Sequence, residues 1–296
     1  MNNSTSEKRD VYTIVTDRII EILKKGTIPW KQPWGEAGIP QNLISRRVYR
    51  GMNIMLLASL GYEQNYFLTY SQIKELGASV KKDEQSHIVT YWNWVEDAEK
   101  ANSKKYPFLR YYKVFNVAQC TGIPVDKIPI VTRQAYPILA CEHILENMPQ
   151  KPKITQKENK AYYNPLQDFI NMPKMGNFTS DESYYATLFH ELVHSTGHLS
   201  RLNRKGLLEM AEYGSLPYSF EELVAEIGAC YLESLTGIVE KQIEDNAAYI
   251  SGWLEKLEND DHFIVMASSQ AQKAVDFIQG VKFEVKEELA EQEVAE

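Results

Sequence analysis

Apolar residues recur at intervals of three and four in several stretches of the chain, as they do on the buried face of a helix. Residues 11–23 show this pattern, and Gly26 follows them with the residue type that commonly ends helices. The same spacing predicts helices over 54–60, 71–76, 136–147, 183–196, 247–257 and 263–278, and one more that begins near residue 218.

Strands are predicted where β-forming residues cluster. Two long runs, 87–95 and 108–117, have this character, and the charged segment between them is interpreted as a solvated insertion. Shorter strands are predicted over 66–69, 161–163 and 167–171. Together the elements predict an α+β fold, with a small α+β domain first and a mainly helical domain with a small sheet after it.

The chain has 296 residues, which exceeds the usual length of one domain. A stretch with two prolines over 123–130 has the character of a connection between domains. We therefore expect four parts, namely an N-terminal domain over 1–125, a connecting segment with a helix over 126–150, a second domain over 151–280 and an acidic tail over 281–296.

The net charge of −8 is unevenly distributed along the chain. Residues 1–130 hold 18 Lys and Arg against 13 Asp and Glu, a balance of +5, whereas residues 131–296 hold 14 against 27, a balance of −13. A positive half joined to an acidic half favours a module that binds a polyanion beside a module with another task.

Nothing in the composition indicates a membrane or secreted protein. No stretch approaches ~20 uncharged apolar residues, the first ten residues are polar, and the three cysteines are scattered. We expect a cytoplasmic protein without a disulfide framework.

A metal-binding pattern lies within the predicted helix 183–196. His190, Glu191 and His194 form H-E-x-x-H, which places both imidazoles on one helix face and a carboxylate beside them. Such a pair can bind one Zn²⁺, and Glu191 can then act as the base for a water. Thr179 and Glu182 can form a capping box at the helix start, and Gly197 can end the helix. The alternative is a buried helix whose histidines only form hydrogen bonds.

The third ligand is not part of this motif. Ser200 stands where a longer zinc motif would place a histidine, and His198 lies beyond the expected helix end. The helix near 218 resembles the E-x-x-x-D helix of thermolysin-like and neprilysin-like zinc peptidases. That resemblance implies Glu222 as the third ligand and Glu226 as the residue that orients a ligating histidine. Alternatively, Ser219 and Glu222 form a capping box without a metal.

Basic residues alternate with aromatic ones in the first half, as in surfaces that bind single-stranded nucleic acid. The run 108–117 holds Arg110 and Lys113 among four aromatic residues. For any single ring, the alternative is a place in the core of a small domain. The candidate DNA-binding residues are Trp30, Lys31, Trp34, Arg46, Arg47, Tyr49, Arg50, Arg110 and Lys113.

These motifs resemble the ArdC antirestriction family over roughly residues 9–275. The resemblance lies in Ile28-Pro-Trp30, Tyr49-Arg50-Gly51-Met52-Asn53, Val114-Phe115-Asn116-Val117, His190-Glu-Leu-Val-His194-Ser-Thr-Gly197-His198 with Arg201 and Arg204, and Glu221-Glu222-Leu-Val-Ala-Glu226. It departs from the family at Asp83, where relatives tend to have Gly, and at Ser195, where an aromatic residue is common.

The resemblance implies a single-stranded-DNA-binding domain followed by a zincin-like metallopeptidase domain that protects incoming mobile-element DNA. It implies one divalent metal, Zn²⁺ or else Mn²⁺ or another ion, and a protein substrate that the sequence does not identify. For the donor to the oxyanion in peptide hydrolysis, Tyr213 and Tyr218 are the candidates. The alternatives are a DNA-shielding protein with a structural metal, and a peptidase that has no DNA role.

Overall fold

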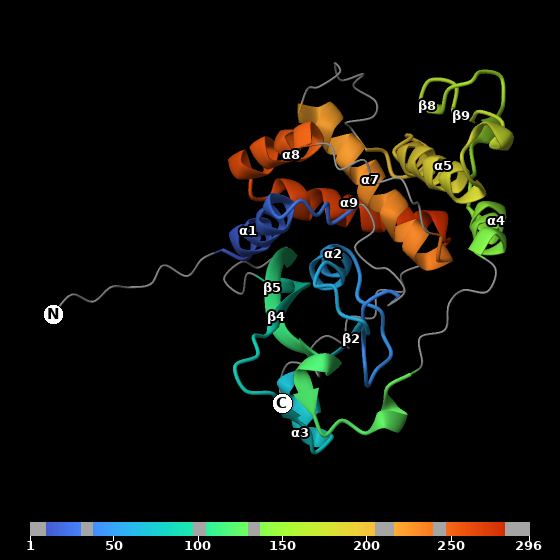
Figure 1. Cartoon of the computed structure of the whole chain (residues 1–296). Helices are drawn as coiled ribbons and strands as arrows, with labels where there is room; N and C mark the ends of the chain where they lie inside the picture. The colour runs from blue at the N-terminus through green and yellow to red at the C-terminus, as the bar shows by residue number, and fades with distance from the viewer. Residues whose placement is uncertain are drawn as a thin grey trace.

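The structure is a computed structural model that describes residues 10–30, 38–96, 105–129, 137–204, 216–238 and 247–281. Lys31, Trp34 and Tyr213 of the predicted sites lie outside these ranges. Figure 1 shows a layer of helices above a region that contains a sheet, and the α+β fold class is confirmed.

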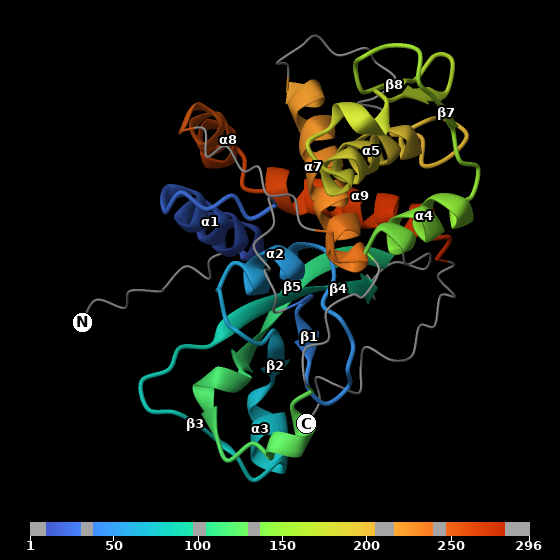
Figure 2. The same ribbon diagram turned by 45° about the vertical axis from the view of Figure 1, so that its right-hand side comes forward.

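The sheet region is built from the first half of the chain. Its four-stranded sheet has the order β1 (Gln41–Asn42), β2 (Tyr66–Leu68), β5 (Lys105–Asn116) and β4 (His87–Glu96). Strands β4 and β5 form one unbroken antiparallel ladder from His87 opposite Val114 to Glu96 opposite Lys105. Beside the sheet lie α2 (Met52–Ala58), α3 (Tyr70–Glu75) and a small pair of strands, β3 (Ser79–Val80) and β6 (Cys120–Thr121) (Figure 2).

The helical layer comes mainly from the second half of the chain. Helix α5 (Asp181–Thr196) packs against α7 (Leu216–Thr236), and α9 (Phe263–Ile278) packs against both (Figure 2). Helices α4 (Pro137–Asn147) and α8 (Ala247–Asn259) flank them. A three-stranded sheet adjoins α5, with β9 (Phe169–Asn171) between β7 (Lys153–Thr155) and β8 (Tyr162–Asn164).

The start of α5 differs from the expected capping box. Ser180 is the N-cap, and its hydroxyl accepts a hydrogen bond from the backbone N–H of Ser183 at 3.1 Å. The box predicted for Thr179 and Glu182 is therefore wrong by one residue, because both Thr179 and Ser180 can serve as caps and sequence alone does not separate them. The end of the helix was predicted correctly, since Gly197 follows its last residue.

Helices α5 and α7 approach each other closely at Gly228. A Cβ atom added there would lie 2.7 Å from the Cγ2 atom of Val193 in α5. Such a distance is too short for a carbon–carbon contact, so glycine is needed for this helix–helix spacing. This close contact fixes α7 relative to the histidines of α5.

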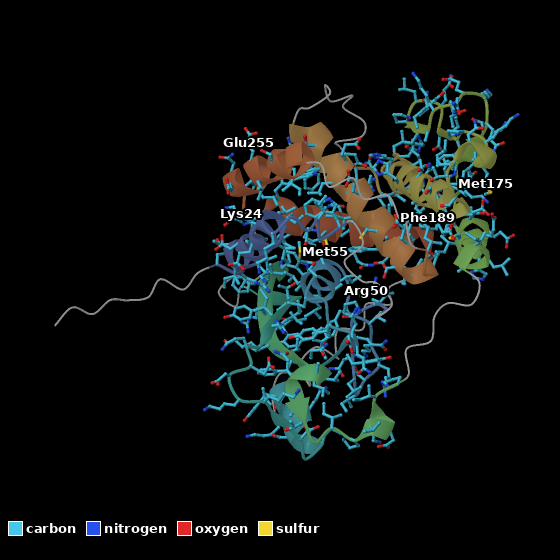
Figure 3. All side chains as sticks on the ribbon, viewed as in Figure 1. Lys24, Arg50, Met55, Met175, Phe189 and Glu255 are labelled. Atoms are coloured by element: carbon cyan, nitrogen blue, oxygen red, sulfur yellow. The ribbon has the colours of Figure 1, made fainter. Side chains whose placement is uncertain are left out.

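The two regions share one hydrophobic core. Helix α1 (Val11–Lys24), from the start of the chain, packs against α8 and α9. Met55 of α2 and Phe189 of α5, labelled in Figure 3, are both fully buried in this core. The predicted boundaries of the four parts stay a prediction, but packing continues from one region into the other.

Polar contacts also join the two regions. The Arg50 guanidinium, before α2, forms an ion pair with Asp276 of α9. The backbone N–H of Gly51 donates to the Gln272 side chain at 2.8 Å, and the Thr13 hydroxyl donates to Asp261 at 2.6 Å. The sheet region and the helical layer are therefore held together by buried apolar packing and by specific hydrogen bonds.

Candidate metal centre

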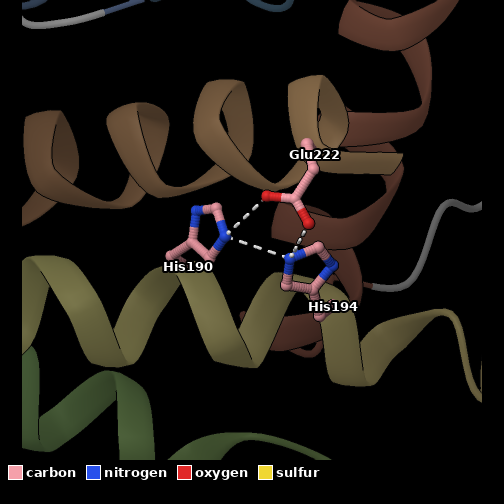
Figure 4. A group of neighbouring side chains, drawn as sticks. All are labelled: His190, His194 and Glu222. Carbon is pink, nitrogen blue, oxygen red and sulfur yellow. Dashed lines mark hydrogen bonds and ion pairs between the residues drawn. The ribbon is translucent and has the colours of Figure 1, made fainter. Parts of the chain in front are cut away.

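Three side chains from two helices meet at one point. His190 and His194 lie one turn apart on α5, and Glu222 faces them from α7 (Figure 4). The two Nε2 atoms are 3.0 Å apart. Glu222 places Oε2 3.5 Å from His190 Nε2 and Oε1 3.5 Å from His194 Nε2. The set that the sequence predicted as metal ligands is thus brought together.

The donor set and its spacing fit a divalent metal. Ligand atoms about 2.0–2.1 Å from a tetrahedral zinc ion lie about 3.3 Å from one another, close to the 3.0 and 3.5 Å separations observed. Two imidazoles and one carboxylate are also the donors of one kind of catalytic zinc site. The His190 and Glu222 side chains are 25% and 29% exposed, so solvent can reach the fourth position.

The tautomer of His194 follows from its second contact. Its Nδ1 lies 3.3 Å from Glu221 Oε1, and only an N–H can donate to a carboxylate. The proton is therefore assigned to Nδ1, which leaves the Nε2 lone pair facing His190 and Glu222. Burial lowers the pKa of His194, but the hydrogen bond and charge of Glu221, with the charges of Glu191 and Glu222, more than offset this and raise it.

Glu221 is itself held by a buried arginine. Arg204 donates from Nε to Glu221 Oε2 at 2.9 Å and from Nη2 to Oε1 at 2.6 Å. Burial raises the pKa of Glu221, but the hydrogen bonds from His194 and Arg204 outweigh burial and hold this pKa below its usual range. Sequence reasoning named both residues within the family motifs but assigned neither a role at the site. The available signals were Glu221 next to a proposed ligand and Arg204 in the run after the H-E-x-x-H motif.

Glu191 lies between the two histidines in sequence and is 8% exposed. Its negative charge acts on His194 and contributes to raising the pKa of that ring. A carboxylate this close to a metal-binding pair is suited to accept a proton from a water.

The capping alternative for Glu222 is wrong. Helix α7 begins at Leu216, so Ser219 lies inside the helix rather than at its N-cap. Glu222 is therefore available to face the histidines. The residue that hydrogen-bonds His194 is Glu221, and the orienting role implied for Glu226 stays a prediction. The side chain of Tyr218 lies outside the described part of the structure, as does Tyr213.

Two of the aromatic residues predicted to bind DNA belong to the core. Trp30 is 1% exposed, and its ring packs edge-on against Trp253 with 5.8 Å between the ring centroids. Tyr49 is 8% exposed and packs edge-on against Phe67. Neither ring can stack on a base without unfolding its surroundings, so both predictions are corrected. Their tertiary neighbours come from distant parts of the chain, which local sequence does not reveal.

The four other described basic candidates lie at the surface of the sheet region, namely Arg46, Arg47, Arg110 and Lys113. Arg50 is exposed too, but its ion pair with Asp276 already uses its charge in the structure. Arg110 lies 5.9 Å from the centroid of the Phe108 ring, which is 55% exposed. This stretch of β5 therefore presents a basic and an aromatic group together, and its binding to DNA stays a prediction.

Family models match both regions of the chain. Residues 140–270 match a zincin-like metallopeptidase domain, so the helix pair and its three candidate ligands lie in a domain of that class, which implies a divalent metal. Residues 9–115 match the N-terminal domain of anti-restriction factor ArdC. Among the described residues, no helix is both long and apolar enough to cross a membrane.

Solved structures agree with this order of domains. The metal-free structure of the antirestriction protein ArdC from plasmid R388 is similar with a TM-score of 0.74 and 38% identity, covering 92% of this chain and 97% of that one. The Mn(II)-bound structure of the same protein gives a TM-score of 0.73 and 36% identity, with coverage of 92% and 98%. The chain belongs to the ArdC antirestriction family.

Curated relatives extend the comparison. The DNA primase TraC of Escherichia coli is 32% identical over 295 residues, which cover 92% of this chain but only 20% of TraC. A second TraC protein of the same species is 32% identical, and the chain covers 27% of it. The uncharacterized protein y4eC of Sinorhizobium fredii is 30% identical, with coverage of 91% of both chains.

Proposed function

We propose that this protein is a metal-dependent peptidase that works on proteins near single-stranded DNA and so protects incoming mobile-element DNA in the cytoplasm. One observation carries the peptidase proposal. His190, His194 and Glu222 converge within 4.8 Å, with the Glu191 carboxylate on the same helix as the histidines. A peptidase of this class needs three ligands, an open position and a base, and these residues supply each of them.

The residues would divide the chemistry among them. His190, His194 and Glu222 would hold the divalent cation, which supplies a Lewis acid for the substrate carbonyl. Glu191 accepts a proton from the attacking water and returns it to the leaving amine. A donor for the developing oxyanion is still required, and Tyr213 and Tyr218 remain the candidates for that role.

Metal analysis and a cleavage assay test this proposal together. The purified protein should hold one Zn²⁺ or Mn²⁺ per chain, and Mn²⁺ is included because the related R388 structure contains Mn(II). Wild-type protein should cleave casein or histone, and Glu191→Gln should lose cleavage by about 100-fold or more while retaining metal. Each assay is run with and without single-stranded DNA. A Glu191→Gln protein that cleaves as fast as the wild type would refute the assigned base.

The DNA proposal rests on the exposed groups of the sheet region. Arg46, Arg47, Arg110 and Lys113 are exposed, and the exposed Phe108 ring lies beside Arg110. Guanidinium and ammonium groups contact phosphates, while an exposed ring stacks on a base for about 1–3 kcal/mol. Affinity for single-stranded DNA should fall steeply with salt, and duplex DNA should bind more weakly. Salt-independent affinity, or equal affinity for duplex DNA, would contradict this proposal.

The second candidate is a DNA-shielding protein in which the metal is structural. The core packing shared by the two regions favours it, because a metal could then stabilise the same fold that holds the DNA surface. The partial exposure of the His190 and Glu222 side chains favours a catalytic site, since structural zinc sites have closed coordination. Glu191→Gln decides between them in a conjugation assay, because full antirestriction activity there would favour the shield.

A further inference from the structure

We propose that Arg204 and Glu221 form a positioning pair that holds His194 in the tautomer and orientation needed to bind the metal. This inference rests on the proposed metal centre. Glu221 Oε1 is shared between His194 Nδ1, at 3.3 Å, and Arg204 Nη2, at 2.6 Å. Neither Arg204 nor Glu221 is one of the three proposed ligands.

The arginine supplies what a glutamate alone lacks. A free glutamate side chain has several rotatable bonds and can present either oxygen to the ring. Arg204 contacts both oxygens, Oε1 with Nη2 and Oε2 with Nε, and so fixes the plane of the carboxylate. With that plane fixed, Oε1 accepts from Nδ1–H of His194, and the Nε2 lone pair remains directed at His190 and Glu222.

The loop that carries Arg204 turns back and lies against the C-terminal end of α5. After α5 ends, the backbone N–H of Leu202 donates to Thr196 O and that of Arg204 donates to Gly197 O, both at 2.9 Å. Arg204 then donates to the Thr196 hydroxyl at 2.6 Å and to Val193 O at 2.8 Å. Its positive charge thus sits at the negative C-terminal end of α5, beside the helical turn that carries His194.

The same loop provides a matched control. The Arg201 side chain is also buried, donates from Nε to Ser195 O at 2.8 Å, and forms an ion pair with Asp168 before β9. Arg201 therefore resembles Arg204 in burial, in its contact with the end of α5 and in its carboxylate partner. The difference lies in the partner, because Glu221 hydrogen-bonds the proposed ligand His194, whereas Asp168 accepts a hydrogen bond from Tyr163.

The test compares three variants of the full chain, Arg204→Lys, Glu221→Gln and Arg201→Lys. Long-range ¹⁵N–¹H NMR of the metal-free protein reports which nitrogen of His194 carries the proton. Chelator competition gives the dissociation constants for Zn²⁺ and Mn²⁺. Melting temperatures of the metal-free proteins show how much each variant loses in stability.

We expect Arg204→Lys and Glu221→Gln to weaken metal binding by about 10- to 100-fold, as changes behind a ligating histidine do. The Nδ1–H preference of His194 should be lost in both variants. Arg201→Lys should keep that tautomer and a metal affinity within about threefold of wild type, even where its melting temperature falls as far as that of Arg204→Lys.

The results that would refute the positioning pair differ from those that would refute the proposed metal centre. Unchanged tautomer and metal affinity in Arg204→Lys, or equal weakening in Arg201→Lys, would overturn the positioning role while leaving the metal centre intact. If Arg204→Lys does not fold, Glu221→Gln decides by the same readouts. A wild type that binds no metal, yet fixes Nδ1–H on His194 and loses it in Glu221→Gln, would refute the metal function and retain the positioning pair.

Discussion

The arginines of the helical layer and of the sheet region have different surroundings. In the helical layer Arg201 and Arg204 are buried, and each binds both a carboxylate and a helix-end carbonyl. In the sheet region Arg47 and Arg110 lie at the surface. Arg50 stands between these cases, since its half-exposed side chain reaches Asp276 across the boundary. The neighbours of an arginine therefore determine whether its guanidinium stabilises the fold or can bind a ligand. The residue type alone does not show which of the two applies.

The largest effect is expected at the proposed metal site of the helical layer. His190→Ala removes one of three proposed ligands and should weaken Zn²⁺ binding by about 1000-fold. This loss corresponds to ~4 kcal/mol, a third of an apparent binding free energy of ~12 kcal/mol. Chelator competition measures this loss. His198→Ala is the control, because His198 instead hydrogen-bonds Ser200 within its own turn. Equal loss in the control would show that the H-E-x-x-H pair does not define the site.

Glu222 and Glu226 provide the next comparison, within one helix. Glu222→Gln should weaken metal binding by about 100-fold, because a neutral amide replaces the anionic ligand 3.5 Å from both histidines. Glu226→Gln should weaken it less, by about 10-fold, if it acts only behind a ligand. Calorimetric titration of both proteins with Zn²⁺ gives the order. The reverse order would exchange the roles of the two residues.

Arg50→Ala probes the contact between the regions. Its removal leaves Asp276, whose side chain is 7% exposed, without this ion pair, and should cost about 1–2 kcal/mol of unfolding free energy. Urea denaturation measures the change. Arg47→Ala, at an exposed site nearby in sequence, should change stability by less than about 0.5 kcal/mol. Equal losses would mean that the ion pair does not stabilise the junction.

The smallest effect is expected at the sheet surface. Arg47→Gln should weaken binding to single-stranded DNA only severalfold and reduce the slope of log affinity against log salt by about 0.7, which corresponds to one phosphate contact. Fluorescence anisotropy at several salt concentrations measures both quantities. Arg201→Gln, at a buried arginine, should leave the slope unchanged. If the slope changes only in the buried variant, the two classes of arginine are assigned the wrong way round.

The comparison also explains which features the sequence could predict. Helix spacing is a local property, so His190 and His194 on one face of α5, and the ends of α1 and α9, were predictable from the residues themselves. The pairing of Glu221 with Arg204 depends on a loop that turns back to α5, and residue spacing does not encode that turn.

Burial of single aromatic residues was the other failure. Trp30 lies in a stretch with prolines and a lysine that looks exposed, yet Trp253 of α8 covers it. Arg110 and Lys113 lie exposed on strand β5, and their role in DNA binding stays a prediction. Where a sequence pattern is ambiguous, contacts between distant segments thus determine whether a side chain is buried or exposed.

The packing of α1 against α8 and α9 has a consequence for the order of synthesis. A ribosome makes α1 first and finishes α9 about 250 residues later, an interval of about 13–50 s at 5–20 residues per second. Val15 and Ile19, both fully buried in the finished protein, lack their partners from the last helices throughout that interval. The nascent chain therefore carries this apolar helix without those partners until α9 has been made, which makes it a natural client for chaperones that bind emerging polypeptides.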